Sequence, residues 1–152
     1  MRKKQDGVAL IEFALALPLL LLLTVLTTEF GRALYEYNTL VKAVRDASRY
    51  LSVQDPSILT TDPGKITIAK RLAVYGNPAG SGSPLAPGLD ITNVPNPTWA
   101  TVGSSPSINT VTIRITGYKF KPLISNLFGF AIGNAAGEIP YADIRATMRA
   151  QS

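Results

Sequence analysis

Apolar residues are concentrated in one long run near the N-terminus, and shorter patterned segments follow it. From Val8 to Thr28 the only charged residue is Glu12. A helix over these residues is about 31 Å long, which is close to the thickness of the hydrocarbon core of a bilayer. The run therefore predicts a membrane-spanning helix over residues 8–28, preceded by a short polar segment, residues 1–7.

Past this run, apolar residues recur at steps of three and four from Phe30 to Leu51. This spacing is typical of an amphipathic helix. Charged residues are expected on its other faces: Arg32, Glu36, Lys42, Arg45 and Arg49. No proline occurs in residues 29–54, so we expect the membrane helix to continue over this range and to end before Pro56.

Residues 55–152 show the patterns of a small mixed domain. Asp62 and Pro63 signal the start of a short helix that Gly76 closes. Residues 76–107 are rich in proline, glycine and serine and predict a long loop.

That loop contains Asp90 and Asn93. Their side-chain oxygens are compatible with a calcium site, and equally with a solvated surface turn, which is the commoner setting for such residues.

Two later segments have the alternation of strands. Val111, Ile113 and Ile115 are expected on one face of the first. The second, residues 141–150, directs Ile144 inward together with either Ala146 or Met148.

An apolar stretch, residues 122–133, lies between these strands. It predicts a helical turn against the sheet, with Phe128 and Phe130 in the core and a subunit contact as the second choice. The whole chain thus predicts an α+β fold: a long N-terminal membrane-spanning helix continues into a small head, residues 55–152, with an antiparallel sheet of two to four strands.

Charge changes this picture only at the N-terminus. The formal net charge is +5, and Arg2, Lys3 and Lys4 directly precede the apolar run. The positive-inside rule accounts for them and predicts a single-pass membrane protein with a cytoplasmic N-terminus and an extracytoplasmic head. No later cluster of basic and aromatic residues predicts nucleic-acid binding.

The chain has no cysteine and no histidine. This excludes the usual zinc sites, cysteine nucleophiles and Ser-His-Asp triads. A Ser-Lys dyad or an Asp pair stays open, but no spacing in the sequence indicates one. We expect no catalytic residues, no cofactor and no metal, and we expect that the protein is not an enzyme.

Three interpretations of the N-terminus remain. A secretory signal peptide lacks support because no A-x-A pattern follows the apolar run. A plain signal anchor tolerates Glu12 if its carboxylate reaches the headgroups. In the third interpretation, Gly7, four apolar residues, Glu12 and Phe13 resemble the processing site of type IV-like prepilins of the tight-adherence (Flp) class.

Further motifs resemble the TadE group of minor pseudopilins in this pilus family. They are the early Glu12-Phe13, Pro18 within the apolar run, a membrane-exit motif (Glu29, Phe30, Gly31 and Arg32), and an Ala-x-Arg-x-Ala-x-Arg-Tyr segment at residues 43–50.

The resemblance implies cleavage between Gly7 and Val8 by a prepilin peptidase. It also implies a pilin-like head and a place in a pilus with the major pilin and a second minor pseudopilin. The implied role is pilus initiation, assembly or adhesion, with Glu12 pairing with the N-terminal ammonium of a neighbouring subunit. The alternative function is an unprocessed, signal-anchored envelope binding domain.

Overall fold

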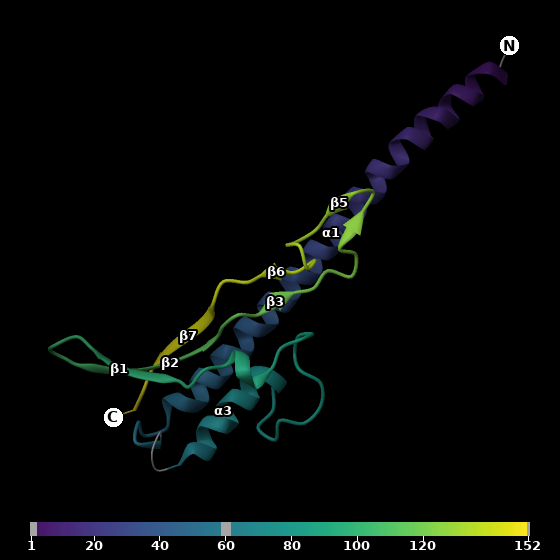
Figure 1. The fold of residues 1–152 in the computed structure, drawn as a ribbon. Coiled ribbons are helices and arrows are strands. Elements are labelled where there is room, and N and C mark those ends of the chain that lie inside the picture. Colours follow the sequence, from purple (N-terminus) through teal and green to yellow (C-terminus); the bar gives the residue numbers. More distant parts are fainter. Residues whose placement is uncertain (1–2, 59–61, 152) are drawn as a thin grey trace. The chain divides into compact units, whose positions relative to one another are not determined.

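A computed structural model describes residues 3–58 and 62–151 of the chain (Figure 1). Its elements are α1 (Lys3–Ser52), α3 (Pro63–Tyr75), the 3-10 helix η1 (Ile91–Asn93), β1 (Thr98–Val102), β2 (Ile108–Ile115), β3 (Lys119–Phe120), β4 (Asn126–Leu127), β5 (Phe130–Ala131), β6 (Ile139–Pro140) and β7 (Ile144–Arg149). The fold is α+β, as predicted.

The chain divides into two compact units, and α1 contributes to both. The anchor unit comprises Met1–Leu34 and Lys121–Ile139, and the head unit comprises Tyr35–Phe120 and Pro140–Ser152. In the described residues the strands form a three-stranded sheet of order β1-β2-β7 and the two-stranded pairs β3-β6 and β4-β5.

Helix α1 has 50 residues and includes Pro18, so it is about 75 Å long. The continuation of the membrane helix predicted over residues 29–54 is present, and α1 ends at Ser52. It begins at Lys3, before the predicted start at Val8, because the preceding residues include no proline and a single glycine is tolerated in a helix. An 18-residue window of α1 has a mean hydropathy of 2.5 and none of it is buried inside the structure, which fits membrane anchoring.

The core of the head unit is formed by one face of α1, by α3 and by the three-stranded sheet. Helix α1 contributes Leu40, Val44, Ala47 and Leu51, and α3 contributes Ile66, Ala69, Ala73 and Val74. The predicted alternation on β2 is confirmed, because Val111, Ile113 and Ile115 are all at most 1% exposed. These residues all lie within one hydrophobic cluster.

The ends of α3 agree with their sequence signals. Pro63 occupies the first turn, where its missing N–H costs no hydrogen bond. Gly76 adopts the left-handed conformation with a φ of 70°, and its N–H donates to the carbonyl of Leu72 at 3.0 Å. A residue with a side chain would be strained at this position.

Strand β7 is antiparallel to β2, with Ile115 opposite Ile144 and Val111 opposite Met148. Ile144 is buried, as predicted. Ala146 and Met148 are both half-buried, and Ala146 packs against the core cluster.

The predicted loop of residues 76–107 contains regular structure that the sequence analysis missed. Strand β1 lies within it and pairs with β2, with Trp99 opposite Val111. Most side chains of β1 are exposed, and its sequence does not alternate between apolar and polar residues. The strand forms because it pairs with β2, and the local sequence gives no signal for that pairing. Asp90 and Asn93 form a capping box around η1: the Asp90 carboxylate accepts from the Thr92 N–H, and the Asn93 side chain accepts from the Asp90 N–H.

The prediction for residues 122–133 is wrong. The segment forms the β4-β5 hairpin, with Leu127 opposite Phe130, and not a helical turn. Phe128 and Phe130 are 58% and 62% exposed and do not lie in the core. Gly129, with a φ of 84°, closes a two-residue turn that a helix cannot accommodate.

Candidate assembly and membrane-exit site

The predicted processing and assembly residues all lie on α1, well before its membrane-exit motif. Val8 and Phe13 are 57% and 59% exposed, and Glu12 is exposed as well. A Cβ built on Gly7 would meet no atom within 4 Å. Glu12 and Glu29 are about 26 Å apart along the helix, so the structure does not bring these two sites together.

The membrane-exit motif forms a compact polar contact within the anchor unit. Glu29 is 6% exposed, and its Oε2 accepts from Arg32 Nη1 at 3.0 Å. Its Oε1 accepts from the backbone N–H of Leu123 at 3.0 Å. Arg32 Nη2 donates to the backbone carbonyl of Lys121 at 3.1 Å. We call this contact of Glu29 and Arg32 with residues 121–123 the exit clamp.

Helix geometry explains which motif residues enter the exit clamp. Residues three apart on a helix share a face, so Glu29 and Arg32 both reach the returning chain. Phe30 is 65% exposed, and a Cβ built on Gly31 would meet no atom within 4 Å. The motif therefore combines two residues that bind the chain's own backbone with two that remain exposed.

The membrane-exit motif indicated Glu29 and Arg32 but not their partners. Lys121 and Leu123 follow them by 89 and 94 residues and take part through backbone atoms. Backbone donors and acceptors carry no side-chain signature, so a sequence pattern gives no signal for them. A second contact fixes the same segment: Lys121 Nζ lies 3.4 Å from Glu138 Oε1.

A further glutamate of α1 is buried in the head unit. Glu36, which we expected on an exposed face, is only 7% exposed. The hydroxyl of Tyr118 donates to its Oε2 at 2.8 Å and lies 3.2 Å from the carbonyl of Pro87. Tyr118 packs edge to face on Tyr141, with ring centroids 5.4 Å apart. The buried face of α1 in the head therefore begins with a carboxylate.

The exposed face of α1 near the exit is correspondingly apolar. Phe30, Leu34 and Tyr37 are 65%, 46% and 44% exposed. Their spacing of four and three residues places them on one stripe of the helix. This stripe continues the apolar character of the membrane-spanning residues.

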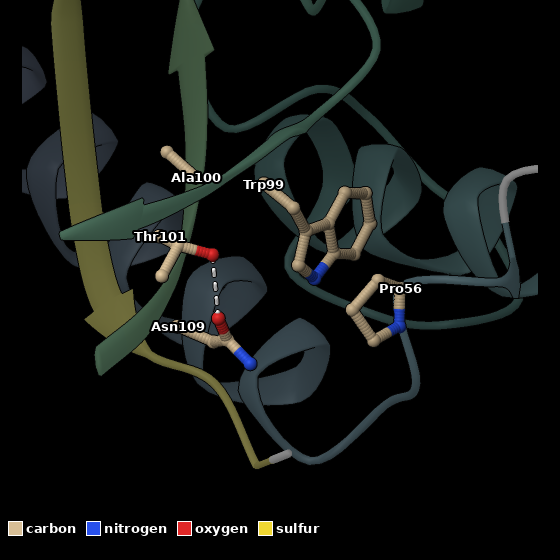
Figure 2. Close-up of a pocket in the computed structure, with 5 residues that line it drawn as sticks. All are labelled: Pro56, Trp99, Ala100, Thr101 and Asn109. Carbon is tan, nitrogen blue, oxygen red and sulfur yellow. Dashed lines mark hydrogen bonds between the residues drawn. The ribbon is translucent and has the colours of Figure 1, made fainter. Parts of the chain in front are cut away.

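The head unit has a small recess beside β1 (Figure 2). It has a volume of about 180 Å³ and is lined by Pro56, Trp99, Ala100, Thr101 and Asn109. The Thr101 hydroxyl donates to the Asn109 side-chain oxygen at 2.8 Å. The indole Nε1 of Trp99 is buried and has no hydrogen-bond partner among the described residues.

Two groups of the head outside the membrane have displaced pKa values. The pKa of Asp55 is lowered because its carboxylate accepts hydrogen bonds from Ser57, including one from the backbone N–H at 2.7 Å. Burial, and to a lesser extent the charge of Asp62, raise the pKa of Tyr50. Both groups lie near the end of α1 and its connection to α3.

Comparison with known proteins gives a match for the N-terminal part of the chain. No curated protein and no solved structure matches the chain. A family model described as TadE-like protein matches residues 7–49. The match begins at Gly7 and includes both Glu12-Phe13 and the exit clamp residues of α1. The resemblance predicted from the motifs is confirmed, because residues 7–49 match the TadE-like family model.

Proposed function

We propose that this chain is a minor pseudopilin of a tight-adherence pilus, which a prepilin peptidase cleaves between Gly7 and Val8. The observation that carries the proposal is the TadE-like match, which begins at Gly7. The protein acts by assembly with other subunits and not by catalysis. Its role is to initiate the filament or to support its assembly or adhesion, together with the major pilin and a second minor pseudopilin.

Cleavage at Gly7 is supported by the local backbone. Gly7 lies in the second turn of α1, close to its N-terminal end. Glycine in a helix is less favourable than alanine by about 1 kcal/mol, so this turn opens into an extended substrate more readily than its neighbours. Cleavage leaves the membrane-spanning residues in place and makes Glu12 the fifth residue of the mature chain.

Assembly is supported by what α1 leaves exposed. The membrane-spanning window is not covered by the chain itself, and the stripe of Phe30, Leu34 and Tyr37 continues its apolar surface. In a bundle of such helices, the new N-terminal ammonium of one subunit approaches Glu12 of another. Each charge then offsets the desolvation of the other, and the pairing fixes the axial register.

The orientation of the protein follows from its basic leader. The N-terminus is cytoplasmic, where the peptidase cuts, and the head is extracytoplasmic. The mature subunit is a single-pass protein of the bacterial inner membrane until it enters the pilus or its tip.

Intact-mass measurement of the membrane-extracted protein tests the processing step. In cells with the peptidase, we expect a mass that lacks residues 1–7, and we expect Gly7→Val to retain them. Because a Cβ at Gly7 meets no atom within 4 Å, a block in this variant reports on the peptidase and not on misfolding. Gly31→Val is the matched control, since it adds the same side chain to α1 at an equally open glycine, and it should be cleaved normally.

The same measurement distinguishes the alternative function. A wild-type protein that keeps residues 1–7 in the presence of the peptidase is a signal-anchored envelope protein, and the pseudopilin proposal is then wrong.

A further inference from the structure

The β4-β5 hairpin of the anchor unit exposes large apolar side chains. Phe128 and Phe130 are 58% and 62% exposed, and Leu123, just before the hairpin, is 79% exposed. Ile124 adds a further partly exposed side chain, at 37%. A cluster of this kind on one short segment indicates a surface that is covered in the functional state.

The tip of the hairpin has an unfavourable residue for its conformation. Phe128 has a φ of 52° and is the only non-glycine residue with positive φ in the described chain; Gly129 follows with a φ of 84°. Two positive φ values in a two-residue hairpin loop define a type I′ turn, for which Asn-Gly is the preferred sequence. An aromatic residue is strained there, and burial within the chain does not offset the strain because the side chain is exposed. Phe128 is therefore better explained by a contact outside the chain than by the turn itself.

The exit clamp directs this hairpin back along α1. Arg32 binds the carbonyl of Lys121, and Glu29, one turn closer to the N-terminus, binds the amide of Leu123. Continuing in this direction, the five residues from Leu123 to Phe128 extend by at most about 16 Å, the length of about ten helical residues. This segment is therefore long enough to bring the tip from the level of Glu29 to that of the membrane-spanning residues.

Burial on α1 agrees with this path. Leu22 and Val25 are half-buried, whereas the residues around them are exposed. They precede Glu29 by seven and four residues and so share its face of the helix.

We propose that the β4-β5 hairpin is a second membrane contact, with Phe128 and Phe130 inserted at the boundary between lipid headgroups and acyl chains. Lipid is the occupant because the exposed apolar side chains of the hairpin belong to the same compact unit as the exposed apolar window of α1. The inference rests on the membrane anchoring of α1 and does not depend on pilus assembly.

The backbone of the hairpin is suited to this position. Asn126 pairs with Ala131 and Leu127 with Phe130, and the Ile132 N–H donates to the Ser125 carbonyl at 2.8 Å. Paired backbone groups lower the penalty of entering the interface. A contact at this point fixes the rotation of α1 about its own axis, which a single helix does not fix by itself.

Fluorescence quenching by brominated lipids tests the proposal on the full chain. The chain has one tryptophan, Trp99, so Trp99→Phe gives a background in which Phe128→Trp is the only indole. The protein is reconstituted in phosphatidylethanolamine and phosphatidylglycerol vesicles that carry bromine at a shallow or a deep position of the acyl chain. Ala135→Trp in the same background is the matched control, since it occupies an exposed loop of the same anchor unit.

We expect the indole at position 128 to lose about half of its emission with shallow bromine and less with deep bromine, since interfacial side chains lie about 5–10 Å below the headgroups. The control indole at position 135 should lose less of its emission than the indole at position 128, with both shallow and deep bromine. Equal, weak quenching at the two positions would overturn the proposal. A blue-shifted emission at position 128 that lipid bromine does not quench, and that depends on protein concentration, would also overturn it and would indicate a second copy as the occupant.

A second variant separates lipid contact from folding. Phe128→Asn places the preferred residue in the type I′ turn, so the hairpin should persist, with unchanged hydrogen exchange at Ile132. An indole introduced at position 130 should then be quenched less by brominated lipid in this variant than when Phe128 is present. Equal quenching with and without Phe128 would show that its side chain does not hold the hairpin in the interface.

Discussion

Removal of the Glu29 carboxylate should release residues 121–139 from α1 without unfolding the head. In Glu29→Ala, the amide of Leu123 loses a charged acceptor and Arg32 loses the carboxylate at 3.0 Å, while its hydrogen bond to the Lys121 carbonyl remains. A hydrogen bond to a charged group contributes about 1.5–3 kcal/mol. The ion pair adds less, because the Arg32 side chain is 28% exposed and solvent screens it. Together they give about 2–4 kcal/mol of local stability.

Hydrogen exchange with mass spectrometry on the full chain in detergent micelles measures this local stability. A loss of about 2–4 kcal/mol accelerates exchange by about 30- to 1000-fold in peptides that cover residues 121–133. Peptides from β2 and β7 should be unchanged, because the head unit has its own core. Glu29→Gln keeps an acceptor for Leu123 but loses the charge, and should accelerate exchange by about fivefold, or about 1 kcal/mol.

The result that would refute this reasoning is specific. If Glu29→Ala and wild type exchange at the same rate in residues 121–133, the exit clamp does not hold this segment. If exchange accelerates equally in β2, the carboxylate stabilises the whole fold and not the anchor unit alone. Arg32→Ala and the double variant complete a cycle whose coupling energy isolates the ion pair.

Three further predictions follow from other glutamate and aspartate contacts. Tyr118→Phe removes a donor to the buried Glu36 and should lower the free energy of unfolding by about 1.5–3 kcal/mol in urea, whereas Tyr35→Phe, at a side chain 74% exposed, should change it by less than about 0.5 kcal/mol. The lowered pKa of Asp55 means that its contribution is complete above the ordinary value of 3.8 and is lost as the pH falls through the folded pKa; Asp55→Ala should therefore reduce the urea midpoint at neutral pH and converge with wild type in acid. Glu12→Ala should insert and be cleaved normally, yet give less subunit in sheared filaments; piliation at wild-type levels would leave Glu12 only a tolerated residue.

Sequence patterns predicted those parts of the fold in which local signals and tertiary packing agree. Helix α1 and α3 carry clear periodicity and end signals, and β2 alternates because one face is buried. Strand β1 and the β4-β5 hairpin were not predicted from the sequence. Strand β1 has mostly exposed side chains, and the hairpin has phenylalanine where a turn signal would have Asn. In both cases the pattern that defines a half-buried strand is absent, because the side chains are not covered by the chain's own core.

The candidate site likewise combines residues that the sequence indicated with contacts that it did not. The side chains of Glu29 and Arg32 were recognisable as a motif, but their partners are backbone groups about ninety residues later. The burial of Glu36 was not predictable from helix periodicity, since its acceptor role depends on where Tyr118 reaches α1. A buried carboxylate needs a specific donor from elsewhere in the fold, and helical spacing alone does not reveal that donor.

The three glutamates of α1 therefore have different tasks along one helix. Glu29 and Glu36 are buried and bind other parts of the same chain, so their loss should first be seen in hydrogen exchange and in unfolding. Glu12 is exposed within an apolar window that the chain does not cover, and a carboxylate there is unfavourable in lipid. Its presence is understandable if a positive charge from outside the subunit reaches it. The cleavage that we propose after Gly7 supplies such a charge at the start of each neighbouring helix. Processing and assembly are then linked by one electrostatic pair: an uncleaved subunit lacks the ammonium at Val8 and should be excluded from filaments even when its own Glu12 is intact.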